Sequence, residues 1–99
     1  MFPSSYVNRE LSPRQFETLI AITRRVPLCP KRKSVEDIET EVRNYSTTTV
    51  FEYLRVLTKL GLAQREKRQG GVYYYCLVAE NRRVALKKVR DLAKVKASR

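Results

Sequence analysis

The chain has few of the residue types on which common catalytic chemistry depends. Its 99 residues contain no histidine and no tryptophan, and they include only two cysteines and three glycines. The sequence holds no phosphate-binding P-loop and no Gly-x-Ser-x-Gly nucleophile motif. General bases and activated nucleophiles are usually assembled from such parts. We therefore expect a protein that is not an enzyme and that uses no cofactor.

The two cysteines are far apart in the sequence. Cys29 and Cys76 each lack a neighbouring cysteine, and there is no histidine to complete a tetrahedral metal site, so we expect no bound metal. Two cysteines also do not make a disulfide framework, and thiols in the cytosol usually stay reduced. The sequence leaves the oxidation state of Cys29 and Cys76 open, because a disulfide becomes plausible if the source is a hyperthermophile.

Long apolar runs are also missing. No run approaches the ~20 residues that a membrane-spanning helix needs. The first residues, MFPSSYVNRE, have neither the basic start nor the apolar stretch of a secretory signal. The sequence predicts a cytoplasmic protein with no membrane partner.

Positive charge is what the chain has in excess. Twenty-one lysines and arginines against ten aspartates and glutamates give a net charge of +11. The charge is uneven, because residues 34–54 carry five acidic and one basic side chain, whereas residues 82–99 carry one acidic and eight basic. A domain this basic is expected to attract a polyanion, and nucleic acid is the most plausible one. An ordinary solvated surface is the alternative.

Three serine caps divide the first part of the chain into helices. Residues 1–10 are expected to form an N-terminal arm, and Ser12, Pro13 and Gln15 then open a helix to about Val26. Ser34 starts a short second helix, whose early carboxylates suit the positive end of its dipole. Ser46 starts a third helix after a connection of about four residues, and Gly61 ends it. That spacing is typical of a helix-turn-helix, although the usual glycine is missing from the turn.

The rest of the chain predicts a hairpin and a last helix. The segments LAQREKR and VYYYCLV flank a Gly-containing loop, which is a hairpin pattern. Alternation turns Tyr73 and Tyr75 inward with Leu77 and leaves Tyr74 outside. The stretch from Ala79 to residue 96 has no proline or glycine and predicts a basic helix. The expected fold is α+β and mainly α, with three helices, a two-stranded β wing and a fourth helix.

The segment TVFEYLRVLTKLGLAQREKRQGGVYYYCL resembles the recognition helix and wing of ArsR-type and MarR-type transcriptional regulators. The matching positions are Thr49, Val50, Leu54, Leu57, Gly61, Leu62, Tyr74, Tyr75 and Leu77. The resemblance covers residues 11–79 and implies a winged helix-turn-helix domain, with 80–99 as a basic C-terminal helix used for dimerisation. Two departures are Phe51, where the family commonly has a small polar residue, and the missing metal-sensing residues.

The resemblance implies a recognition helix, 46–60, in the DNA major groove and a wing, 62–78, on the backbone or in the minor groove. The side chains expected to meet DNA from the helix are Thr47, Thr48, Phe51, Glu52, Arg55 and Lys59. Those expected from the wing are Arg65, Lys67, Arg68, Gln69 and Gly70. A solvated helix face, and a charged edge that only prevents sheet aggregation, are the simpler interpretations.

The last helix carries an apolar stripe opposite its basic face. The stripe consists of Ala85, Leu86, Val89, Leu92 and Ala93. We expect it to form a homodimer interface, the alternative being that it covers its own domain. The prediction is thus a homodimeric, sequence-specific double-stranded DNA-binding protein and transcriptional regulator. A winged helix that binds a protein partner, or one that binds RNA, remains the other possibility.

Overall fold

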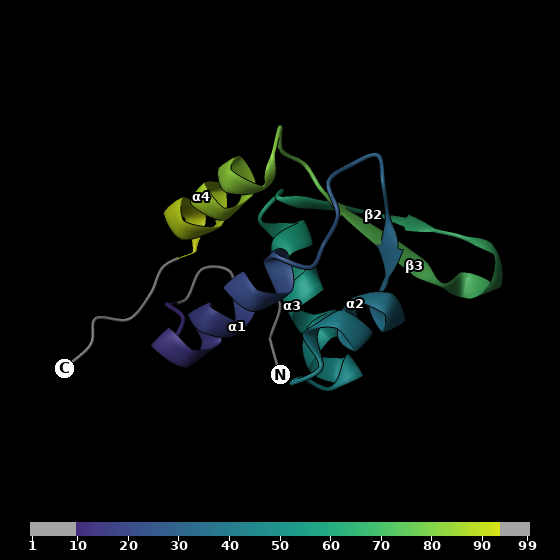
Figure 1. Cartoon of the computed structure of the whole chain (residues 1–99), viewed down its shortest axis with the longest axis horizontal. Helices are drawn as coiled ribbons and strands as arrows, with labels where there is room; N and C mark the ends of the chain where they lie inside the picture. Colours follow the sequence, from purple (N-terminus) through teal and green to yellow (C-terminus); the bar gives the residue numbers. More distant parts are fainter. Residues whose placement is uncertain (1–9, 94–99) are drawn as a thin grey trace.

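The computed structural model describes residues 10–93, which form four α-helices and a three-stranded antiparallel sheet. Figure 1 shows the hairpin of β2 and β3 extending away from the helices. The elements in chain order are α1 (Pro13–Thr23), β1 (Lys33–Ser34), α2 (Val35–Val42), α3 (Thr47–Lys59), β2 (Ala63–Lys67), β3 (Tyr73–Leu77) and α4 (Arg82–Leu92). The α+β class is therefore confirmed. Within the described residues, no helix is long and apolar enough to cross a membrane.

Each of the first three helices begins at its expected serine. The Ser12 hydroxyl accepts a hydrogen bond from the Gln15 N–H at 3.1 Å, and the Gln15 side chain accepts one from the Ser12 N–H at 2.9 Å. Ser34 and Ser46 likewise cap α2 and α3. Such caps satisfy N–H groups that a helix leaves unpaired at its first turn. The first helix stops at Thr23, slightly before the expected Val26.

In the turn between α2 and α3, an arginine adopts the positive φ that a glycine usually supplies. Arg43 has a φ of 64°, in the region that side chains other than glycine rarely adopt. Its N–H still donates to the Glu39 carbonyl at 2.9 Å, which closes the last turn of α2. This one residue reverses the chain so that α3 begins four positions later.

The sheet has one strand more than the two expected. The short strand β1 pairs with β3, Lys33 lying opposite Tyr75 and Ser34 opposite Tyr74, so the strand order is β1-β3-β2. The expectation of a two-stranded wing is wrong, because a strand of two residues, the second of which is itself the cap of α2, is too short to show alternation. The inward position of Tyr75 and Leu77 is confirmed, since both are fully buried, and Tyr73 packs against the core.

The core lies between the four helices and one face of the sheet. From α3 it receives Val50, Leu54 and Leu57, none of which is exposed to solvent. Burying side chains of this size is worth about 1.5–3 kcal/mol each. The inner stripe therefore fixes the rotation of α3 about its axis, and the opposite side of that helix is held facing outward.

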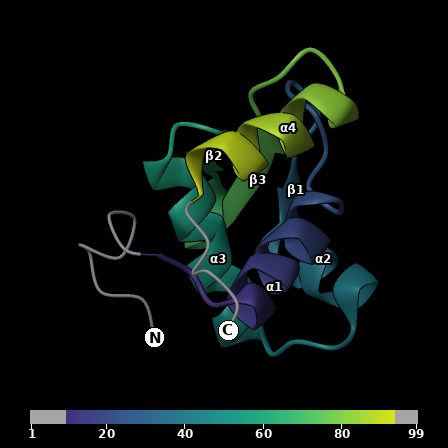
Figure 2. The ribbon, with the colours of Figure 1, turned by 90° about the vertical axis from the view of Figure 1, so that its left-hand side faces the viewer.

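The last helix packs on α1, and three of the residues expected at a dimer interface are buried within the chain itself. In Figure 2, α4 lies above α1, which it contacts. Ala85, Val89 and Ala93 are buried in the chain's own core, while Leu86 is half-buried and Leu92 is 49% exposed. The expected arm, apart from Glu10, and residues 94–99 of the expected C-terminal helix lie outside the described residues.

An arginine fixes the start of α4 to the end of α1. The Arg82 guanidinium donates to the carbonyl oxygens of Thr23, at 3.0 Å, and of Val26. Carbonyls at the end of a helix have no partner within it, so a cationic donor is well suited to them. This positive charge in the basic segment therefore serves the fold.

The two cysteines, whose oxidation state the sequence leaves open, form a disulfide. Cys29 and Cys76 are joined across a sequence separation of 47, with their Cα atoms 4.9 Å apart. The loop after α1 runs beside the end of β3, where the Leu77 N–H donates to the Pro27 carbonyl at 2.8 Å and the Cys29 N–H donates to the Leu77 carbonyl at 3.0 Å. These backbone bonds place the two sulfurs within reach of each other, which no sequence spacing indicates.

Candidate nucleic-acid interface

The outward side of α3 carries all the residues expected to read DNA. Thr47 and Thr48 are exposed in the first turn, and Arg55 and Lys59 are exposed further along. The half-buried residues of the same side are Phe51 and Glu52. These side chains share one face because the opposite face is held in the core.

The hairpin has two faces, one that packs toward α3 and one that faces away from it. We call the face against α3 the inner face, because its Ala63, Tyr75 and Leu77 belong to the core that α3 also lines. Side chains alternate along a strand and cross-strand partners share a face, so Arg65 and Lys67 also belong to the inner face. Glu66 and its partner Tyr74 belong to the opposite, outer face.

The inner face and α3 border a hollow that is open to solvent on one side. Its volume is about 350 Å³, and it is lined by Phe51, Arg55, Thr58, Lys59 and Arg65. We call it the α3–β2 hollow. It brings together four residues predicted as DNA contacts, from two separate elements, and no acidic side chain lines it. Thr58 was not among the predicted contacts, and its place on the outward arc of the helix is the signal that could have found it.

Aromatic stacking orients the arginine of the hollow. The Arg65 Cζ lies 4.4 Å from the centroid of the Tyr73 ring. A guanidinium stacked in this way keeps its in-plane N–H groups available to a second partner. Deeper on the same face, burial raises the pKa of Tyr75, and the nearby Arg65 opposes that rise. The phenol is thus held in its neutral form beside a permanent cation.

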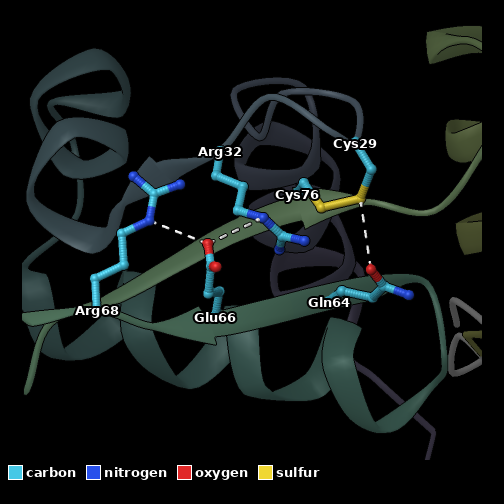
Figure 3. A network of polar contacts seen from close by, with 6 residues as sticks. All are labelled: Cys29, Arg32, Gln64, Glu66, Arg68 and Cys76. Atoms are coloured by element: carbon cyan, nitrogen blue, oxygen red, sulfur yellow. Dashed lines mark hydrogen bonds and ion pairs between the residues drawn. A yellow bond between two sulfur atoms is a disulfide. The ribbon is translucent and has the colours of Figure 1, made fainter.

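On the outer face, one carboxylate forms ion pairs with two arginines (Figure 3). One Glu66 carboxylate oxygen lies 3.4 Å from Nε of Arg32 and 3.0 Å from Nε of Arg68. The Arg68 Cζ also lies 4.2 Å from the centroid of the Tyr74 ring. Arg68, predicted as a DNA contact, is therefore already engaged within the protein. Arg32 is a charged partner that the sequence pattern did not indicate, because it lies in a loop.

The remaining predicted wing contacts lie at the hairpin tip. Lys67, Gln69 and Gly70 are exposed, and Gly70 has a φ of 86°, which favours glycine over other residues. The tip offers little chemistry of its own beyond one ammonium and one amide, so it suits contact with a backbone better than recognition of bases.

Comparison of the chain with protein-family models, with curated proteins and with solved structures gives no significant match. The site must therefore be interpreted from its own geometry. Residues 10–93 contain no group of three or more histidine, cysteine or acidic side chains able to hold a metal ion. What the geometry presents is a projecting helix face, a hairpin beside it and a cationic hollow between the two.

Proposed function

We propose that this chain is a winged helix-turn-helix protein that binds double-stranded DNA sequence-specifically and regulates transcription in the cytoplasm. The observation that carries the proposal is the α3–β2 hollow, in which cations of a projecting helix and of a hairpin strand converge. A polyanion that meets both elements at once satisfies this arrangement better than any small neutral partner. The net charge of +11 supports the same class of partner.

In this proposal α3 enters the major groove, which is wide enough for an α-helix. The exposed Thr47 and Thr48 lie at its N-terminal end, where residues of a recognition helix reach base edges most easily. Arg55 has the donor fork that suits a guanine, and Phe51 offers an apolar surface to a thymine methyl group. The tip of the hairpin then follows the phosphate backbone or the minor groove.

The acidic helix α2 constrains the orientation on DNA. Glu36 and Asp37 in its first turn are exposed, and Glu41 pairs with Lys33. Carboxylates near phosphates are repelled, so the first turn of α2 is expected to point away from the duplex. The contact would therefore be concentrated on α3 and the hairpin.

The test is a titration of the full chain with duplex DNA of random sequence and with duplex RNA, each at two salt concentrations, followed by binding-site selection. We expect DNA binding whose log K falls linearly with log salt, with a slope of roughly −0.9 per phosphate contacted. Phe51→Ala should weaken preference at a thymine more than it weakens binding to random DNA. Lys88→Ala, an exposed cation on α4, is the control and should leave the selected motif unchanged.

A salt-independent response, or tighter binding to RNA than to DNA, would contradict the proposal. No selected motif from random DNA would remove sequence specificity and leave a non-specific nucleic-acid binder. Absence of any nucleic-acid binding would favour the protein-interaction alternative.

The proposal includes a homodimer, for which only part of the apolar stripe of α4 is accessible. Only Leu92, which is 49% exposed, and the half-buried Leu86 are accessible on the expected stripe. Leu92→Glu should shift a dimer to monomer in sedimentation at micromolar concentration, whereas Lys88→Glu should not. Val89→Glu is unsuitable for this purpose, because Val89 is fully buried and a charge there would unfold the monomer. A monomeric wild type would remove the homodimer and limit binding to a single half-site.

A further inference from the structure

The α3–β2 hollow concentrates positive charge that nothing in the described protein neutralises. Arg55 and Lys59 are one turn apart on α3, and Arg65 faces them from β2. Within residues 10–93 none of the three forms an ion pair, whereas Arg32, Lys33, Arg68 and Lys87 all do. Like charges held together repel, so the hollow has an electrostatic reason to take up an anion.

We propose that the hollow is a phosphate-binding site, with Lys59 and Arg65 as its ligands, while Arg55 lines the same hollow and adds positive charge but keeps its donor fork for the guanine assigned to it above. Arginine is suited to phosphate because its planar fork can donate two parallel hydrogen bonds, and lysine adds a compact charge. Stacking on Tyr73 fixes the plane of the Arg65 guanidinium before an anion arrives. Less rotational freedom is then lost on binding.

The other two lining residues define what surrounds the phosphate. The Thr58 hydroxyl donates to the Leu54 carbonyl at 2.9 Å, so its proton is already used within the helix. Phe51 supplies an apolar wall that suits the sugar or base attached to a phosphate. The volume of about 350 Å³ is near the lower end of the ~300–1,000 Å³ typical of ligand pockets, which is enough for a phosphate with its sugar.

Two sources supply this chemistry. A backbone phosphate of DNA would enter the hollow while α3 lies in the major groove, and in this form the inference rests on the proposed function. The phosphate of a free nucleotide would bind independently of DNA. Both sources use the same two ligands, Lys59 and Arg65, so one set of variants tests them together.

The first arm of the test uses the small anions alone. The isotopically labelled full chain is titrated with inorganic pyrophosphate and with thymidine monophosphate at constant ionic strength, and backbone amide shifts are recorded. We expect saturable shifts at positions 51–59 and 65. Lys59→Gln and Arg65→Gln should each weaken binding at least tenfold. Lys88→Gln removes one exposed charge far along the chain and should bind like the wild type.

The second arm uses a fixed DNA duplex across a range of salt concentrations. Each hollow variant should reduce the magnitude of the salt slope by about one, because one phosphate contact is lost. Lys88→Gln should leave the slope unchanged. Circular dichroism of every variant confirms that an altered response reflects the missing cation and not loss of the fold.

The two proposals fail in different ways. If the anions cause no saturable shift and the hollow variants keep the wild-type salt slope, the phosphate site is wrong, and duplex binding by the wild type would still support the proposed function. If the wild type binds no duplex but the anions shift the hollow and the variants abolish those shifts, the phosphate site holds for free nucleotides and the proposed function is wrong.

Discussion

The two faces of the hairpin use the same residue types for opposite purposes. On the outer face Glu66 holds both Arg32 and Arg68, and Cys29 is bonded to Cys76 beside them. On the inner face Arg65 stacks on Tyr73 and has no carboxylate partner. It lines the hollow that lies between the hairpin and α3. On the outer face the carboxylate of Glu66 offsets part of the positive charge of two arginines, whereas the cations lining the inner-face hollow have no carboxylate partner within residues 10–93.

This difference shows that a count of basic residues overstates the charge available to a partner. Arg82 caps the end of α1, and Arg68 is shared between a carboxylate and an aromatic ring. These cations stabilise the fold or the hairpin. The net charge of +11 therefore includes charges of very different availability, and their environments decide which of them can bind a polyanion.

The largest expected effect, on the stability of the fold, comes from removing the Cys29–Cys76 disulfide. Cys29→Ala combined with Cys76→Ala should lower the free energy of unfolding by about 4 kcal/mol, the loop-entropy value for a sequence separation of 47. Denaturant unfolding measures the loss, and the wild type with a dithiol reductant is the matching control. A loss below about 1 kcal/mol would mean that the backbone bonds around Leu77 hold the loop without the disulfide.

The second effect separates base recognition by α3 from sequence-independent backbone contact by the hairpin. Arg55→Ala should cost roughly 1–3 kcal/mol on the preferred DNA site and relax base preference at one position. Arg68→Ala should weaken all sequences about equally and by less, because Arg68 is engaged with Glu66. Binding-site selection on both variants shows which of the two arginines recognises bases. If Arg68→Ala changes the selected motif while Arg55→Ala preserves it, the roles must be exchanged.

The third effect concerns alkaline pH and the inner face. The raised pKa of Tyr75 means that the folded state favours the neutral phenol, so its contribution is complete below the pKa of unfolded tyrosine, 10.0, and is lost as pH rises through the folded pKa. The wild type should lose stability relative to Tyr75→Phe by up to about 1.4 kcal/mol per pH unit above that value. Unfolding at pH 8 and at pH 11 measures the difference. A parallel decline in both proteins would refute the assignment.

The smallest effect comes from releasing the cations of the outer face. Glu66→Gln should destabilise the protein by less than about 1 kcal/mol, because both of its ion pairs are partly exposed. It should also steepen the salt dependence of DNA binding by about one phosphate contact, since Arg68 becomes free. Anisotropy titrations at several salt concentrations measure this. Weaker DNA binding by Glu66→Gln would show that the outer face does not compete with the DNA.

Local signals were the most informative part of the sequence. The caps at Ser12, Ser34 and Ser46 act through residues three positions away, so their helices could be placed correctly. The inner and outer arcs of α3 followed from periodicity in the same way, and burial of Val50, Leu54 and Leu57 confirms the inner one. Both kinds of signal span less than two helical turns.

Contacts between distant segments gave no comparable signal. The disulfide and the Arg32–Glu66 pair depend on how the loop after α1 lies across the sheet. The apolar stripe of α4 was recognised, but periodicity cannot say whether α1 or a second copy covers it. The structure places Ala85 and Val89 within the chain's own core. Which cations lack a partner is a property of the same kind and could not be foreseen.

The shortness of β1 has a mechanical consequence for the hairpin. Its two residues pair only with Tyr74 and Tyr75, so β3 has a strand on both sides in its middle and only β2 as its strand partner at Tyr73, toward the tip. Beyond this point residues 68–72 have no strand beside them. Amide hydrogens should exchange slowly at the root and quickly at the tip. The tip is therefore the part of the hairpin with the fewest strand contacts, and in the proposed complex it is the part that would adjust to grooves of different width.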